Sequence, residues 1–61
     1  MDPDATLRLI SEYLNDNEDH EAYMSCEDLY KWIEKGGYKP NWNQYPNASK
    51  VYKSWAKAVR G

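Results

Sequence analysis

The sequence predicts an all-α fold: a compact three-helix domain covering residues 1–61, with helices at about 3–15, 18–35 and 47–60. Three observations support this prediction. Apolar residues recur every three or four positions in three separate segments, as they do on one face of a helix. Residues that end helices, "NDN" at 15–17 and "GG" at 36–37, separate these segments. A chain of 61 residues is also short enough to form a single domain around one small core.

The first segment opens with "DPDATL", a typical helix start. Asp2 is the predicted N-cap, and Pro3 occupies the first helical position, where its missing N–H costs nothing. Asp4 favours the positive end of the helix dipole. The predicted buried face of this helix comprises Leu7, Leu9, Ile10, Tyr13 and Leu14.

The second helix is predicted to begin at a cap formed by Asn17 or Asp19. Its buried stripe comprises Ala22, Cys26, Leu29 and Ile33, with Trp32 on one flank. On the other flank lies a parallel row of Tyr23, Glu27, Tyr30 and Glu34. The rings of this row have two interpretations, because amphipathic side chains either cover the edge of a core or face a partner.

The segment "EKGGYKPNW" predicts an ordered Gly-Gly aromatic loop between the second and third helices. Gly36 supplies the left-handed residue that ends a helix, and Gly37 lets the chain turn back. Pro40 keeps the preceding residue extended, so the helix does not resume. We therefore expect Tyr38 and Trp42 to lie as lids across the open end of the two-helix hairpin.

The third helix is predicted to follow Pro46, with Asn47 as its N-cap and Gly61 at its end. Its predicted buried side comprises Ala48, Val51, Tyr52, Trp55, Ala58 and Val59. Its opposite side carries a basic stripe of Lys50, Lys53, Lys57 and Arg60. We expect the helix to dock through Val51, Trp55 and Val59, leaving the lysines in water.

The net charge of −2 conceals an uneven distribution. Residues 1–34 contain all ten acidic residues and two basic ones, a balance of −8. Residues 35–61 contain six basic residues and no acidic one, a balance of +6. Long-range fields follow such an arrangement rather than its sum, so the molecule is expected to have two oppositely charged regions.

Residues 2–42 resemble a group of small uncharacterised proteins from actinobacteria and their bacteriophages. The resemblance rests on the "DPDATL" start, the acidic "DNEDHEA" link and the segment "DLYKWIEKGGYKPNW". The sequence departs from the group's pattern at Lys39, where an apolar residue is usual, and in its basic third helix, which many members lack. The resemblance implies a helical fold and a phage or actinobacterial setting, with no associated activity.

Catalysis is not expected from this chain. His20 is the only histidine and lies in the acidic link, and Cys26 belongs to the buried stripe. The acidic link also lacks the glycine and the spacing of a calcium loop, so we expect no metal site and no cofactor. The chain has neither a secretory signal nor a membrane-spanning stretch, which predicts a cytoplasmic protein (in the host cell, if it is phage-encoded).

These observations favour a small non-catalytic protein-interaction module, an accessory protein that contacts a host or viral protein. The candidate anchors are Tyr23, Tyr30 and Trp42, and Lys53 and Lys57 are the candidate steering charges. Self-association is a variant, in which the acidic end of one copy contacts the basic helix of another.

Nucleic-acid binding is the alternative function. In that case Lys50, Lys53, Lys57 and Arg60 would contact phosphates, with Lys35 and Lys39 extending the stripe and Tyr38 or Trp42 offering a ring for stacking. A solvated helix face is the simpler interpretation of the same stripe. A membrane-surface role competes with the need to bury the apolar side of the helix.

Overall fold

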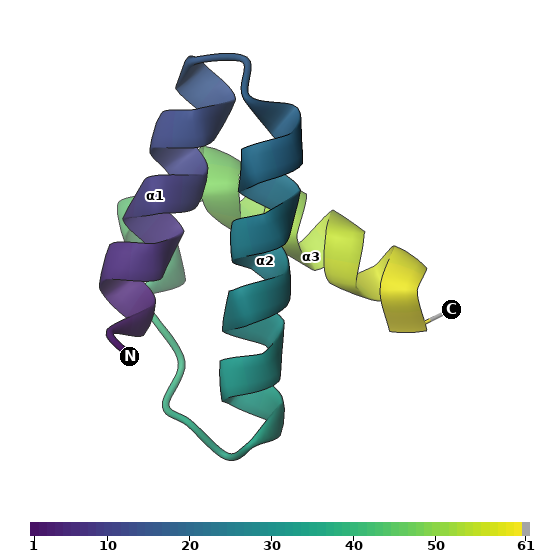
Figure 1. Cartoon of the computed structure of the whole chain (residues 1–61). Helices are drawn as coiled ribbons and strands as arrows, with labels where there is room; N and C mark the ends of the chain where they lie inside the picture. Colours follow the sequence, from purple (N-terminus) through teal and green to yellow (C-terminus); the bar gives the residue numbers. More distant parts are fainter. Residues whose placement is uncertain (61) are drawn as a thin grey trace.

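A computed structural model describes residues 1–60 and shows three α-helices within them. They are α1 (Pro3–Asn15), α2 (Asp19–Glu34) and α3 (Pro46–Arg60), and a short 3-10 helix, η1 (Trp42–Gln44), precedes α3. Helices α1 and α2 form an antiparallel hairpin, and α3 crosses behind both and projects past α2 (Figure 1). The predicted all-α, three-helix fold is confirmed. Both ends of α2 and the start of α3 differ from the prediction by one residue, and the predicted end at Gly61 lies outside the described residues.

The start of α1 also holds the loop that precedes η1. Asp2 caps the helix as predicted, its Oδ1 accepting hydrogen bonds from the N–H groups of Asp4 and Ala5 at 3.0 and 3.3 Å. The N–H of Asn41, in the loop, donates a hydrogen bond to the Oδ1 of Asp4 at 2.7 Å. Two acidic residues in one helical turn therefore stabilise the helix start and fix the returning loop against it.

The turn between α1 and α2 corrects the predicted cap of the second helix. Asn17 adopts a left-handed conformation, with φ of 59°, and the N–H of Glu18 donates to the carbonyl of Tyr13 at 2.8 Å. This is a Schellman ending of α1, which asparagine tolerates better than most residues. The predicted capping of α2 by Asn17 or Asp19 is wrong. Glu18 occupies the N-cap position, and its side chain makes no capping hydrogen bond.

The two glycines that follow α2 have different structural roles. Gly36 adopts φ of 94°, and the next N–H, from Gly37, donates to the carbonyl of Trp32 at 3.0 Å, so this helix also ends in a Schellman motif. Gly37 is required by a close approach, because a Cβ there would lie 2.3 Å from Cε2 of Trp32. The same indole donates from Nε1 to the carbonyl of Tyr38 at 2.9 Å.

All three α-helices contribute to the core. Its buried apolar members are Leu7, Ile10, Ala22, Cys26, Leu29, Ala48 and Tyr52. Partly buried side chains pack around them, including Tyr13, Leu14, Trp32, Ile33, Trp42, Val51 and Trp55. The prediction of buried positions is wrong for Leu9, Ala58 and Val59, which are exposed. Leu9 and Val59 are 40% and 56% exposed. The C-terminal end of α3 projects past the hairpin (Figure 1).

Two further expectations for the loop and α3 are corrected. Tyr38 is not a lid on the core: it is 62% exposed and makes an edge-to-face contact with Trp32 outside the core, whereas Trp42 packs against the core as predicted. Asn47 lies inside the first turn of α3 rather than capping it, and its Oδ1 accepts a hydrogen bond from Oγ of Ser11 at 2.9 Å. The amide therefore ties α3 to α1.

Candidate functional site

An open hollow of about 470 Å³ lies between the C-terminal half of α2, the loop before η1 and the second half of α3. Three aromatic residues line it: Tyr30, Trp42 and Tyr52. Four cationic residues surround them: Lys39, Lys53, Lys57 and Arg60. Glu34 is its one acidic lining residue. We call this hollow, with these eight residues, the aromatic–basic groove.

Ring contacts fix the aromatic part of the groove. Trp42 stacks on Tyr52, with ring centroids 5.2 Å apart and an interplanar angle of 28°. Tyr30 makes an edge-to-face contact with Trp55 at 5.7 Å. The hydroxyl of Ser49 donates to the carbonyl of Trp42, which holds that residue against α3. The rings are therefore ordered before any partner arrives, and little side-chain entropy remains to be lost on binding.

Tyr52 links the core to the groove. Its side chain is almost fully buried, and burial raises the pKa of Tyr52 above its ordinary value. Nearby Cys26, Tyr30 and Glu34 shift this pKa in the same direction, and Arg60 opposes them. The phenol therefore stays neutral at physiological pH and serves as a packing residue rather than a charged one.

The basic residues of the groove are free of internal ion pairs among residues 1–60. The ion pairs in this part of the chain are Arg8–Glu12 on α1 and Glu27–Lys31 on α2, both between exposed side chains outside the groove. Lys53 makes a different kind of contact, with its Nζ 5.5 Å from the ring centroid of Trp42. A cation over an indole is attracted by the negative face of the ring. The groove thus presents ordered rings beside cations that keep their charge available.

Four of the five predicted partner-binding residues lie together in this groove. Tyr30 contributes from α2, Trp42 from η1, and Lys53 and Lys57 from α3. Tyr23 does not join them. It is 48% exposed and lines a second hollow of about 400 Å³ on the other flank of α3.

The predicted basic stripe of α3 is also divided between the two hollows. Lys53, Lys57 and Arg60 line the aromatic–basic groove, whereas Lys50 lines the second hollow with Val51, Ser54, Trp55 and Ala58. The stripe therefore does not act as one row of charges beside one surface. The second hollow has a single cation and a mostly apolar lining.

Sequence reasoning missed the groove role of Tyr52. This residue is predicted to lie in the core, which is correct, but its ring also lines the groove. Lys39 is predicted to extend the basic stripe, and the structure places it on the groove with Lys53, Lys57 and Arg60. The neighbouring Pro40 is buried.

Neither of the residues considered for catalysis lines the groove. His20 is exposed in the first turn of α2. Cys26 is fully buried, and burial raises the pKa of its thiol to about 11, which keeps it protonated at neutral pH. A reactive cysteine has the opposite environment, partly exposed and electropositive. Within residues 1–60, no three His, Cys, Asp or Glu side chains are grouped so as to hold a metal ion.

Comparison with known proteins yields no family model, no curated protein and no solved structure that matches this chain. Among the described residues, no helix has the length and apolar character needed to cross a membrane.

Proposed function

We propose that this chain is a non-catalytic protein-interaction module that binds its partner through the aromatic–basic groove. The observation that carries the proposal is the convergence of three ordered rings and four cations around one hollow, from segments well separated in the sequence. Tyrosine, tryptophan and arginine dominate the binding energy of protein interfaces. The buried, protonated state of Cys26 and the exposed position of His20 support a role without catalysis.

The charges of the groove define the chemistry of the partner. Four cations against one carboxylate favour a segment that carries Asp or Glu side chains. Tyr30 and Trp42, which are partly exposed, favour an apolar side chain of the partner in the hollow. Charge complementarity of this kind mainly speeds encounter and excludes wrong partners, whereas the rings supply the contact area. The resemblance of residues 2–42 to small actinobacterial and phage proteins suggests an accessory role in such a cell, with a host or viral protein as the partner.

Nucleic-acid binding is the second candidate, and the grouping of Lys53, Lys57 and Arg60 favours it. The state of Trp42 favours a protein partner instead. A single strand binds largely by stacking its bases on free rings, but Trp42 already stacks on Tyr52 and carries the ammonium of Lys53 over its ring.

Affinity recovery from an actinobacterial lysate tests the proposal. The wild-type protein and the groove variant K53E/K57E serve as tagged baits, and K35E/K50E, which has the same change of charge outside the groove, is the matched control. We expect proteins recovered by the wild type and by K35E/K50E to be lost with K53E/K57E. Recovery of the same proteins by all three baits would contradict a role for the groove.

Fluorescent oligonucleotides test the second candidate on the same three proteins. The nucleic-acid function requires binding at about 50 mM salt that weakens steeply by about 200 mM and disappears in K53E/K57E. The protein-interaction proposal predicts that K53E/K57E does not specifically lose oligonucleotide binding. A tight, groove-dependent complex with an oligonucleotide would replace the first candidate by the second.

A further inference from the structure

The structure separates two oppositely charged surfaces of this molecule. The first is the aromatic–basic groove. The second is the turn between α1 and α2, where four exposed carboxylates gather; we call these the acidic tip: Asp16, Glu18, Asp19 and Glu21. None of the four forms an ion pair with a residue between 1 and 60. Both surfaces therefore present unpaired charge to solvent.

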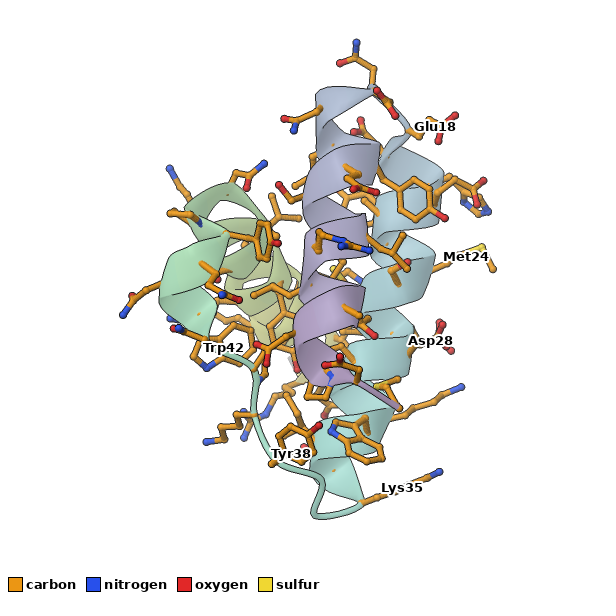
Figure 2. All side chains as sticks on the ribbon, turned by 90° about the vertical axis from the view of Figure 1, so that its left-hand side faces the viewer. Glu18, Met24, Asp28, Lys35, Tyr38 and Trp42 are labelled. Carbon is orange, nitrogen blue, oxygen red and sulfur yellow. The ribbon has the colours of Figure 1, made fainter. Side chains whose placement is uncertain are left out.

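The two surfaces lie too far apart to neutralise each other within one molecule. Figure 2 shows Glu18 at one end of the hairpin, with Tyr38 and the loop that leads to Trp42 toward the other end. Along α2 the rise from Asp19 to Tyr30 and to Glu34, which line the groove, is about 16 and 22 Å, more than the roughly 10 Å over which charges are screened at 0.1 M salt. Attraction between the acidic and basic regions can thus be satisfied at close range only between separate molecules.

We propose that the acidic tip of one copy occupies the aromatic–basic groove of another copy, an inference that rests on the proposed binding role of the groove. The tip matches the groove in chemistry as well as in sign. Tyr23 and Met24, in the next turn of α2, are 48% and 54% exposed, and Met24 points away from the hairpin in Figure 2. They supply apolar contact area beside the carboxylates, as the partly exposed Tyr30 and Trp42 do beside the lysines.

This contact joins two different surfaces, and that sets the form of the assembly. Such a contact either pairs two copies reciprocally, tip to groove in both directions, or continues head to tail and leaves one free tip and one free groove at the ends of the assembly. The groove at the end of such an assembly remains open to a different acidic partner. Self-association and partner binding therefore compete for the same site.

Sedimentation velocity of the untagged protein tests the inference. At about 50 mM salt we expect the average mass to rise above 7.2 kDa as the concentration increases, and to return to 7.2 kDa at about 1 M salt, where charges are screened within about 3 Å. The variant K35E/K50E, with the same change of charge outside the groove, should associate like the wild type. A wild type that stays at 7.2 kDa up to about 1 mM protein in low salt overturns the inference.

Mixing two complementary variants is the most direct test of the proposed contact. The groove variant K53E/K57E keeps its acidic tip, and the tip variant D16K/E18K keeps its groove. Each should remain monomeric alone, whereas an equimolar mixture should associate, because the acidic tip of the first variant matches the unchanged groove of the second. Failure of the mixture to associate, or association of either variant alone at the wild-type level, contradicts the proposed contact.

These outcomes separate the inference from the function on which it rests. If the copies do not associate but K53E/K57E still loses proteins recovered from lysate, the groove binds a different partner and only the self-contact is refuted. If K53E/K57E associates and recovers proteins like the wild type, the groove is not a binding site and both proposals fail.

Discussion

The two halves of α3 share one amphipathic pattern but have different roles. In the first half, Ala48, Ser49 and Tyr52 are buried against the hairpin. In the last turn, residues 57–60 are all exposed, and Val59 is 56% exposed although it continues the apolar spacing. The difference arises because α3 crosses the hairpin and runs past α2 (Figure 1). An apolar pattern therefore continues beyond the core, into a turn whose Lys57 and Arg60 line the groove.

Tyr52 and Val59 give the largest contrast between these halves. We expect Tyr52→Ala to lower the free energy of unfolding by about 3–5 kcal/mol, because it removes a buried ring that stacks on Trp42. That loss equals roughly the whole stability of a domain of this size, so the variant should be largely unfolded. Val59→Ala should change stability by less than about 0.5 kcal/mol. Urea unfolding followed by circular dichroism measures both, and equal losses would refute the division of α3.

The stability of the protein at alkaline pH tests the burial of Cys26 in the core against which the first half of α3 packs. Burial raises the pKa of Cys26 from 9.0 to about 11, so above pH 9 the unfolded state loses this proton first. The contribution of the protonated Cys26 thiol to the free energy of unfolding is complete below pH 9. It is lost as the pH rises through 11, at about 1.4 kcal/mol per pH unit. Comparing wild type with Cys26→Ala by urea unfolding at pH 8, 9 and 10 isolates this slope. Parallel pH dependences would mean that the thiol is accessible to solvent.

Substitutions of Gly36 and Gly37 test how the loop places Trp42 against the first half of α3. Gly37→Ala places a Cβ against the indole of Trp32, and we expect a loss of about 1–3 kcal/mol with a changed tryptophan emission spectrum. Gly36→Ala meets no atom within 4 Å but forces a left-handed alanine, which costs about 1–2 kcal/mol. Its emission spectrum should match the wild type. Identical spectra for the two variants would remove the proposed contact between Gly37 and the indole.

Two serines of α3 give the smallest expected contrast. Ser49 is buried and donates to the carbonyl of Trp42, so Ser49→Ala should lower stability by about 0.5–1.5 kcal/mol. Ser54 is exposed in the second half, and Ser54→Ala should be neutral or slightly stabilising, because alanine is the better helix former. Thermal unfolding followed by circular dichroism measures the stability of both variants. A stabilising Ser49→Ala would show that this hydrogen bond does not anchor Trp42.

The features predicted well from the sequence depend on neighbouring residues. Asp2 caps α1 through N–H groups two and three positions ahead, and Gly36 ends α2 through its own left-handed backbone. Such signals act over a few residues and need no tertiary structure. The fold class followed from them and from the apolar spacing of the three helices.

The features that sequence reasoning missed depend on how the helices are placed in space. The spacing of Val59 is that of a buried residue, but its exposure depends on where α3 leaves the hairpin. Lys50 shares a stripe with Lys53 in the sequence, whereas the crossing of α3 assigns them to different hollows. The requirement for glycine at position 37 depends on the packing of Trp32, which local turn rules do not describe.

Nuclear Overhauser effects between aromatic side chains test most directly the docking of α3, on which the core and the groove both depend. Ring centroids 5.2 and 5.7 Å apart predict clear cross-peaks between Trp42 and Tyr52 and between Tyr30 and Trp55. Their presence would establish that α3 meets η1 and α2 as described, with Lys53 and Lys57 bordering the groove. Their absence in a folded sample would mean that α3 docks elsewhere, and the groove would not exist in this form.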